Sequence, residues 1–298
     1  MIRMPELPDI KAYVNALNDR ICGGVLRGMR IANPFVLRSV DPRPADIAGL
    51  EVDSVKHQAK RVDIRLEGDV SILIHLMIAG RLHWKEPGVH LKGRNQLAAL
   101  DFDNGTLVLT EAGMKRRAAI HLVRGNDARS QFDRGGLDPL SISQQAFRER
   151  LSSENHTCKR ALTDQRLLSG IGNAYSDEIL FAAKLSPFKQ TQALEDGEWR
   201  RLYEATRTVL AHWIESLQRQ AGGQFPRKVT AFRDGMSVHG RYGKPCPVCG
   251  SPIQRIVYVE NEANYCARCQ TGGRLLADRA MSRLLKDNWP KRLEDLEG

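Results

Sequence analysis

The first hydrophobic pattern along the chain has helical spacing. One apolar stripe predicts a helix over residues 8–22, formed by Ile10, Val14, Leu17 and Ile21. Pro8 suits the first turn of this helix, because its fixed φ and missing N–H group are tolerated there. Gly23 and Gly24 then end the helix.

From about Leu26 to Val123 the pattern changes to short β-prone runs separated by turn residues. The runs cover residues 62–66, 70–76, 97–102 and 106–110. Asp103-Asn104-Gly105 predicts a tight hairpin between the last two runs. Several short strands divided by turn signals favour a β-sandwich or barrel.

Beyond a glycine-rich linker the pattern becomes helical. Helices are predicted over residues 143–152, 161–168, 174–184 and 199–222, and a hairpin with cysteines follows. A last helix ending near Pro290 is predicted from Leu275, Leu276, Met281, Leu284 and Leu285. We therefore expect an α+β chain, and we divide it into an N-terminal β domain with the first helix, a linker, a helical domain, a cysteine hairpin and a helical tail. Their predicted bounds are 1–134, 135–142, 143–235, 236–272 and 273–298.

The composition is that of a soluble globular protein, with 42% hydrophobic and 27% charged residues among 298. The sequence has no apolar run of about 18 residues and no signal peptide pattern, so we expect no membrane association and a cytoplasmic location. The formal net charge is +10. This charge favours nucleic acid as a partner, although a basic solvated surface would explain it equally well.

Four of the six cysteines form two C-x-x-C pairs separated by sixteen residues. The pairs are Cys246 with Cys249 and Cys266 with Cys269. Two tight turns of this kind at the base of a hairpin predict tetrahedral coordination of one structural Zn²⁺ by four thiolates. The alternative, free thiols or a redox pair, is disfavoured by the spacing.

A glycine-rich turn, Ser169-Gly170-Ile171-Gly172-Asn173, lies between two predicted helices. The following helix is expected to start near Asn173 and to point backbone N–H groups outward, which suits a phosphate. Asn173 adds a side-chain donor. Taken alone, the two glycines favour an ordinary corner between helices over a phosphate site.

Four segments, taken together and in order, resemble the formamidopyrimidine-DNA glycosylase and endonuclease VIII family of base-excision repair enzymes. They are Met4-Pro5-Glu6-Leu7-Pro8-Asp9, residues 75–82, the stretch from Asp164 through Gly172-Asn173-Ala174-Tyr175 to Glu178, and residues 242–270. The resemblance implies a β-sandwich domain, a hinge, a helix–two-turn–helix domain and a zinc finger. It also implies a monomer that binds double-stranded DNA with a damaged base or an abasic site, and Gly172, Asn173 and Tyr175 as DNA-binding residues.

The resemblance further implies the chemistry. Pro5 would attack C1′ of the sugar with its free amine, Glu6 would be the general acid/base, and Asp9 matches a carboxylate of the same motif. Lys60 matches a lysine that contacts phosphate near the lesion. The implied activity is that of a DNA glycosylase that removes oxidised bases, with AP lyase activity by β/δ-elimination. From sequence alone Pro5 is equally a helix-initiating proline, and Lys60 a solvated lysine.

The first departure from the family concerns the chemistry. Met1, Ile2 and Arg3 precede Met4, and a Pro5 nitrogen in a peptide bond cannot form a Schiff base. Two hypotheses follow: a start at Met4 with methionine removal, giving a lyase, or a monofunctional or non-catalytic DNA-binding relative.

Further departures concern the surfaces that contact DNA. Asn261 stands where the family's finger has an arginine, at an acidic tip that includes Glu260 and Glu262. Ile78 occupies the position of a methionine that fills the space left by an extruded base. Arg116 and Arg117 match two arginines of a loop whose phenylalanine is missing here, and Met114 is a candidate substitute. The segment 222–232 is short where the family has a lesion-capping loop, which weakens a prediction of 8-oxoguanine specificity.

Overall fold

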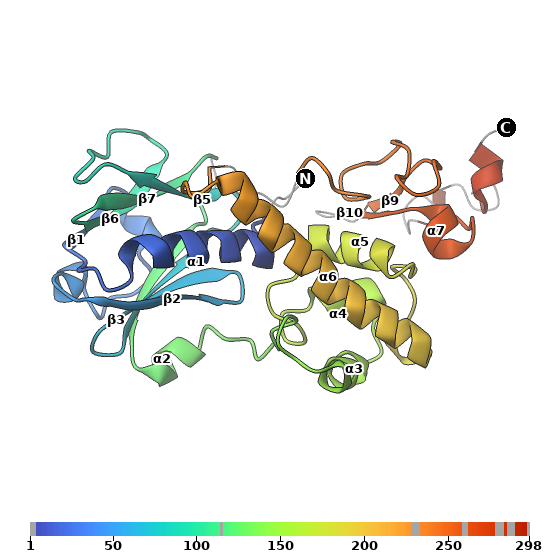
Figure 1. Cartoon of the computed structure of the whole chain (residues 1–298), viewed down its shortest axis with the longest axis horizontal. Helices are drawn as coiled ribbons and strands as arrows, with labels where there is room; N and C mark the ends of the chain where they lie inside the picture. Colours follow the sequence, from blue (N-terminus) through green and yellow to red (C-terminus); the bar gives the residue numbers. More distant parts are fainter. Residues whose placement is uncertain are drawn as a thin grey trace. The chain divides into compact units, whose positions relative to one another are not determined.

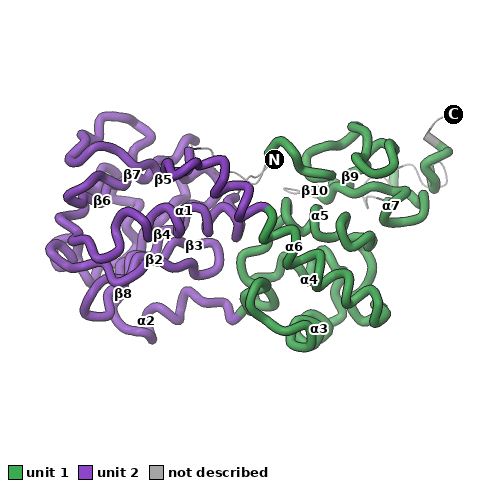
Figure 2. The backbone as a smooth tube through the Cα atoms, viewed as in Figure 1, with its two compact units in different colours: residues 1–2, 136–212, 231–298 green, residues 3–135, 213–230 purple. Residues whose placement is uncertain are grey.

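The computed structural model describes residues 4–113, 116–227, 233–257, 262–277, 283–284 and 290–296. They belong to two compact units (Figure 2). Of the described residues, unit 2 holds 4–135 and 213–227, and unit 1 holds 136–212 and those from 233 onward. The division runs through one long helix, between His212 and Trp213. The domain bounds expected from the sequence stay a prediction.

Unit 2 holds two four-stranded antiparallel sheets and the N-terminal helix (Figure 1). The first sheet has the order β1-β6-β7-β5 and the second β2-β3-β4-β8. The strands are β1 (Gly28–Ile31), β2 (Val52–Gln58), β3 (Arg61–Leu66), β4 (Val70–His75), β5 (Gly80–Lys85), β6 (Gln96–Phe102), β7 (Gly105–Glu111) and β8 (Ala119–Arg124). The helices are α1 (Leu7–Ile21) and α2 (Asn126–Ser130), and the 3-10 turns are η1 (Pro34–Val36) and η2 (Pro44–Ile47).

One hydrophobic core joins α1 to both sheets of unit 2. Its members come from the apolar stripe of α1 and from the inward faces of the strands. Asn18 fixes α1 against β2, because its amide donates to the Val55 carbonyl (2.8 Å) and accepts from the Val55 N–H group (2.9 Å). The expected β-sandwich and first helix are confirmed.

The predicted hairpin joins β6 to β7. Phe102 pairs with Gly105 across a two-residue turn of Asp103 and Asn104, which confirms the prediction. Gly105 lies against the Trp84 ring, and that ring packs between Phe102 and Phe225.

Unit 1 contains helices and one small hairpin. The helices are α3 (Gln144–Ser152), α4 (Cys158–Thr163), α5 (Asn173–Ala182), α7 (Ala267–Thr271) and the part of α6 (Asp196–Ala221) up to His212. The hairpin pairs β9 (Gln254–Val257) with β10 (Glu262–Tyr265), and η3 (Thr191–Ala193) and η5 (Leu293–Leu296) are 3-10 turns. Within the described part of the chain, no helix is long and apolar enough to cross a membrane.

The helix predicted over 161–168 begins and ends earlier than expected. The Thr157 side chain accepts from the Arg160 N–H group and caps the start of α4 (3.3 Å). The Asp164 carboxylate accepts from the Arg166 N–H group (2.9 Å) and forms a turn that ends the helix. Hydroxyl and carboxylate caps therefore set the limits of α4 here, rather than the apolar spacing.

The tail also differs from its prediction where it is described. Leu275 and Leu276 are not helical: they extend beside Tyr265, whose hydroxyl accepts from the Leu276 N–H group (2.7 Å). These two leucines pack against the β9–β10 hairpin in a non-helical segment, and the predicted helix is wrong at both positions. Met281 and Leu285, which the same prediction used, lie outside the described residues.

We predict that Gly105→Ala destabilises the protein by about 1–3 kcal/mol, because overpacking a rigid core has this cost. A Cβ atom at this position would lie 2.4 Å from two carbons of the Trp84 ring. Urea unfolding followed by circular dichroism measures the difference. Gly28→Ala in β1 is the matched control, since its Cβ would meet nothing within 4 Å. Equal unfolding free energies for the two variants would contradict the packing described here.

Candidate functional site

The segment Pro5-Glu6 is buried at the start of α1 in unit 2. The Glu6 N–H group donates to the Asp9 carboxylate at 2.8 Å. Asp9 is fully buried, so this carboxylate both caps the first turn of α1 and holds the Glu6 backbone in place. The two residues that the resemblance implies as nucleophile and acid/base are therefore adjacent and fixed by a third residue of the same motif.

Lys60 lies in the turn between β2 and β3, next to Ala59, which has a positive φ of 53°. Burial lowers the pKa of the Lys60 ammonium group, while the Glu6 and Asp9 carboxylates oppose this shift. The structure thus brings Lys60 into the electrostatic field of the N-terminal segment, from a strand connection about fifty residues away. A half-buried ammonium group beside two carboxylates is suited to attract a phosphate or to take part in proton transfer.

Ile78 lies in the connection between β4 and β5, and it is half-buried. This connection is tight, because the Gly80 N–H group donates to the Leu76 carbonyl (2.9 Å) and a Cβ on Gly80 would lie 2.3 Å from that oxygen. The Arg81 guanidinium donates to the Ile78 carbonyl (3.2 Å). The backbone that carries Ile78 is therefore braced on both sides.

Arg116 and Arg117 are both exposed, in the connection between β7 and β8. The buried Glu111 carboxylate accepts from the N–H groups of Arg117 (2.8 Å) and Ala118 (2.9 Å). One carboxylate thus shapes the backbone beneath the two arginines. No pattern in the sequence predicts this role for Glu111. Met114 lies outside the described residues.

In unit 1 the glycine-rich turn is clamped by Gln165. Its side-chain oxygen accepts from the Gly170 N–H group (2.8 Å), and its amide donates to the Ile171 carbonyl (2.6 Å). Gly170 has a positive φ of 84°, which a side chain would disfavour. Helix α5 starts at Asn173 after Gly172, as expected. The Asn173 amide donates to the Glu262 carbonyl of β10 (2.7 Å), so the turn is joined to the hairpin.

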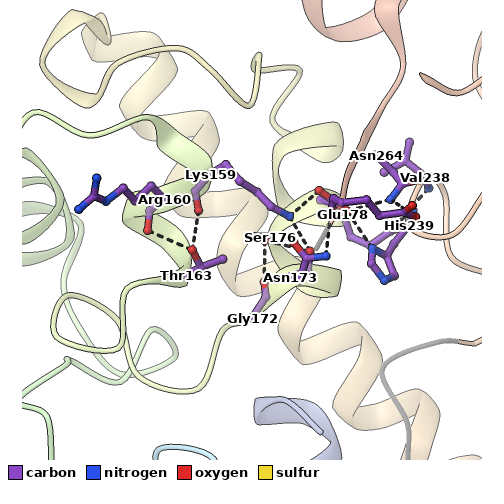
Figure 3. A network of polar contacts seen from close by, with 12 residues as sticks. Lys159, Arg160, Thr163, Gly172, Asn173, Ser176, Glu178, Val238, His239 and Asn264 are labelled. Atoms are coloured by element: carbon purple, nitrogen blue, oxygen red, sulfur yellow. Dashed lines mark hydrogen bonds and ion pairs between the residues drawn. The ribbon is translucent and has the colours of Figure 1, made fainter. Parts of the chain in front are cut away.

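A buried polar network lies behind this turn (Figure 3). The Lys159 ammonium group donates to the Asn173 carbonyl (2.6 Å) and pairs with the Asp177 carboxylate (2.5 Å). The other oxygen of Asp177 lies 2.8 Å from Nδ1 of His239. Sequence reasoning missed this network, because its members are distant in the chain and follow no known spacing.

Glu178 and Tyr175, both on α5, face the interior of unit 1. The Glu178 carboxylate accepts from the N–H groups of Ser237 (2.8 Å), Val238 (2.9 Å) and His239 (2.9 Å). Tyr175 is fully buried, so its ring packs inside the unit rather than at its surface. The motif over residues 164–178 therefore contains the glycine-rich turn and also buried residues that support it.

The four paired cysteines converge at the base of the β9–β10 hairpin. Their sulfur atoms all lie within 4.8 Å of one another, with Sγ–Sγ distances of 3.4 Å (Cys249 to Cys266) and 3.9 Å (Cys246 to Cys269). A tetrahedral zinc with Zn–S bonds of about 2.3 Å places its sulfurs about 3.8 Å apart, so the cluster fits this ion. Gly250 has a positive φ of 74° beside Cys249 and forms the expected turn.

At the described edge of the hairpin tip, Glu262 is not an exposed acid. It is 7% exposed, its carboxylate accepts from the Asn264 amide (3.0 Å), and it lies 3.8 Å from the Arg255 guanidinium. Glu262 is therefore a buried and paired carboxylate, and the prediction that it forms part of an exposed acidic tip is wrong. Glu260 and Asn261 lie outside the described residues.

Three family models match the chain in order. They are the formamidopyrimidine-DNA glycosylase N-terminal domain over residues 4–119, the H2TH domain over 136–222, and the zinc finger found in FPG and IleRS over 243–272. A formamidopyrimidine-DNA glycosylase of Thermus thermophilus is 34% identical over 278 residues, covering 91% of this chain and 100% of the relative. An uncharacterized formamidopyrimidine-DNA glycosylase-like protein of Mycobacterium tuberculosis is 41% identical over 151 residues, covering 51% of this chain and 94% of that protein.

Solved structures agree with these matches. The crystal structure of the Thermus thermophilus enzyme aligns with a TM-score of 0.74 and 32% identity, covering 89% of this chain and 98% of that one. The Lactococcus lactis enzyme, in a complex with abasic-site DNA, aligns with a TM-score of 0.78 and 22% identity over 89% of this chain and 99% of that one, a likeness of fold. The expected β-sandwich, helix–two-turn–helix and zinc-finger architecture is confirmed. By the length and identity of these matches, the chain belongs to the formamidopyrimidine-DNA glycosylase family.

Proposed function

We propose that this protein is a base-excision repair DNA glycosylase that removes an oxidised base and then cleaves the strand as an AP lyase. The observation that carries the proposal is the buried Pro5-Glu6 segment, held by Asp9 at the start of α1, in a chain of this family. The net charge of +10 supports a polyanionic substrate. Two of the similar solved structures, both of the Lactococcus lactis enzyme, are complexes with DNA that contains an abasic site or FAPY-dG.

The proposed reaction begins with a nucleotide turned out of the duplex, because a stacked base and its sugar are not accessible. The secondary amine of Pro5, once free of any preceding residue, attacks C1′ and forms a C–N bond as the bond to the base breaks. The Glu6 carboxyl group transfers the protons that these steps require. The C1′–O4′ bond of the sugar ring then breaks and O4′ takes a proton, which converts the adduct into a Schiff base between Pro5 and C1′. Loss of a proton from C2′ then expels the 3′-phosphate, and a second elimination expels the 5′-phosphate.

The remaining residues position the substrate in this proposal. Lys60 binds a phosphate near the reacting sugar, and Gly172 and Asn173 offer donors at the start of α5. Ile78, Arg116 and Arg117 contact the DNA where the base has left the stack. Asp9 acts through Glu6 and is a positioning residue, because its carboxylate is used by the Glu6 N–H group.

We also propose that Cys246, Cys249, Cys266 and Cys269 hold one structural Zn²⁺. Four thiolates close the coordination shell, so the ion has a structural role. The cysteines pack against Phe181 of α5, Val238 and Ile253, which joins the hairpin to the helices of unit 1.

We predict that borohydride traps a covalent adduct with abasic-site DNA only when the chain begins at Pro5. The same chain carrying Met1-Ile2-Arg3-Met4 has its Pro5 nitrogen in a peptide bond and should give no adduct. Denaturing gel electrophoresis and intact-mass measurement detect the product. Absence of an adduct from the Pro5 form would exclude the lyase mechanism, and base release without an adduct would identify a monofunctional glycosylase.

We predict that the affinity for abasic-site DNA falls as pH rises, and that the fall begins at a pH below the usual pKa of lysine. The Lys60 ammonium group is charged at low pH, and its lowered pKa means that this charge is lost earlier as pH rises. Fluorescence anisotropy between pH 7 and 10 measures the effect. Lys60→Arg should remove this step, because arginine stays charged, whereas the exposed Lys85→Arg should retain it. The same step in both variants would exclude Lys60 as its source.

We predict about one zinc per chain, and loss of this zinc in Cys249→Ser. Removing one thiolate opens the coordination shell and should lower the melting temperature of unit 1. Plasma mass spectrometry and calorimetry give the two readouts. Cys22→Ser is the control, since Cys22 is exposed in unit 2, distant in sequence from the cluster. Full zinc content in Cys249→Ser would show that the cluster does not hold the ion as proposed.

A further inference from the structure

An open hollow on unit 2 is formed by three segments that are far apart in the sequence. It has a volume of roughly 860 Å³. Its lining residues are Asn33, Phe35, Arg38, Arg94, Asn95, Gly113 and Arg116. Of these only Arg116 was singled out from the sequence. The proposed mechanism uses none of the others, so their common location needs an explanation.

The segment that carries Phe35 is held rigidly. The Asn33 N–H group donates to the Leu97 carbonyl of β6 (3.1 Å), and the Arg38 N–H group donates to the Ile120 carbonyl of β8 (2.9 Å). Between these anchors Val36 is buried, whereas Phe35 is 76% exposed. The pinned backbone therefore keeps the exposed Phe35 ring at the wall of the hollow.

The charge of the hollow is positive. Arg38, Arg94 and Arg116 contribute three guanidinium groups, and no carboxylate is among its lining residues. Within the described part of the chain, no ion pair neutralises these arginines. Arg116 is oriented by a hydrogen bond to the Arg94 carbonyl (2.5 Å). The Asn33 side-chain oxygen accepts from the Phe35 N–H group (3.1 Å), which leaves its NH₂ group as a donor, and the Asn95 amide can donate and accept.

We propose that this hollow binds a DNA nucleotide whose base has lost its stacking partner. Arginines bind the phosphates on either side, Phe35 stacks on the open face of the base, and Asn33 and Asn95 meet its polar edge. The assignment rests on the proposed function, because extrusion of a damaged nucleotide uncovers bases that a duplex otherwise keeps stacked. Phe35 thereby becomes a specificity residue on the β-sandwich domain, outside the Pro5-Glu6 segment.

Gly113 supplies a way to test the hollow without disturbing its walls. A Cβ atom on Gly113 would meet nothing within 4 Å, so a small side chain fits there. Gly113→Asp places a carboxylate among the three arginines, and Gly113→Asn places an uncharged side chain of the same shape. A difference between these two variants reports charge alone.

The first measurement uses a duplex with a tetrahydrofuran abasic-site analogue opposite 2-aminopurine. Stacking quenches 2-aminopurine, so the complex of the unaltered protein should be dimmer than that of Phe35→Ala. The dissociation constant of Phe35→Ala should rise about tenfold, as expected for one base–aromatic stack. Val40→Ala is the control: Val40 is 90% exposed on the same segment but does not line the hollow. It should leave both readouts unchanged.

The second measurement follows the dissociation constant against salt concentration. Arg94→Gln should reduce the slope of log affinity against log salt by about 1, because one phosphate contact is lost. Arg124→Gln, which removes an exposed arginine outside the hollow, should not. Gly113→Asp should weaken binding about tenfold, as for loss of one charge-assisted contact, and Gly113→Asn less than twofold.

The outcomes separate this inference from the proposed function. If the protein binds lesion DNA and releases bases while Phe35→Ala, Arg94→Gln and Gly113→Asp behave as the unaltered protein does, the hollow is not a nucleotide site and the function stands. A protein that binds the duplex through the hollow but releases no base and gives no borohydride adduct supports the hollow and overturns the enzymatic proposal. A protein that does not bind the duplex at all overturns both.

Discussion

Buried carboxylates that accept backbone N–H groups fix the parts of this protein on which its proposed chemistry depends. Asp9 holds the Glu6 backbone, Glu111 holds Arg117 and Ala118, and Glu178 holds residues 237–239. Each carboxylate is almost completely buried, and hydrogen bonds to a charged group are worth about 1.5–3 kcal/mol. Removing one such group would take the acceptor from one backbone N–H group at Asp9, two at Glu111 and three at Glu178. The loops are therefore shaped by acids placed beneath them, and their exposed side chains have little part in setting their conformation.

The N-terminal segment depends in addition on how α1 is seated. The apolar face of α1 belongs to the same core as both sheets, and the Asn18 amide binds Val55 of β2 through both of its polar atoms. This helix cannot rotate or slide without breaking that pair of hydrogen bonds. Pro5 and Glu6 are consequently held by the whole β-sandwich, although they lie at the end of the chain where fraying is usual. The same frame keeps Lys60 close enough for its pKa to respond to Glu6 and Asp9.

The sequence predicted those features that depend on local spacing. The stripe of α1, the hairpin at Asp103-Asn104 and the cysteine pairs each follow a short-range rule, and the structure agrees with them. Spacing along the sequence does not predict which groups pair with the buried charges. Lys159 and Asp177 are eighteen positions apart, and Asp177 and His239 sixty-two, so only the folded chain reveals that they meet. The predicted bounds of α4 are wrong, because side-chain caps rather than apolar periodicity set the ends of this helix.

One departure from the family motif has an explanation in these terms. The missing phenylalanine follows Arg117 on an exposed loop, whereas the buried Glu111 carboxylate holds the backbone of that loop in place. A scaffold fixed from below tolerates exchange of the residues above it, since a surface substitution changes stability by only about 0.5 kcal/mol. An exposed aromatic ring on the rigid 33–38 segment can then take over a stacking role that another loop has lost. The hollow around Phe35 fits such an exchange, because it places an exposed ring and Arg116 in the wall of one surface depression.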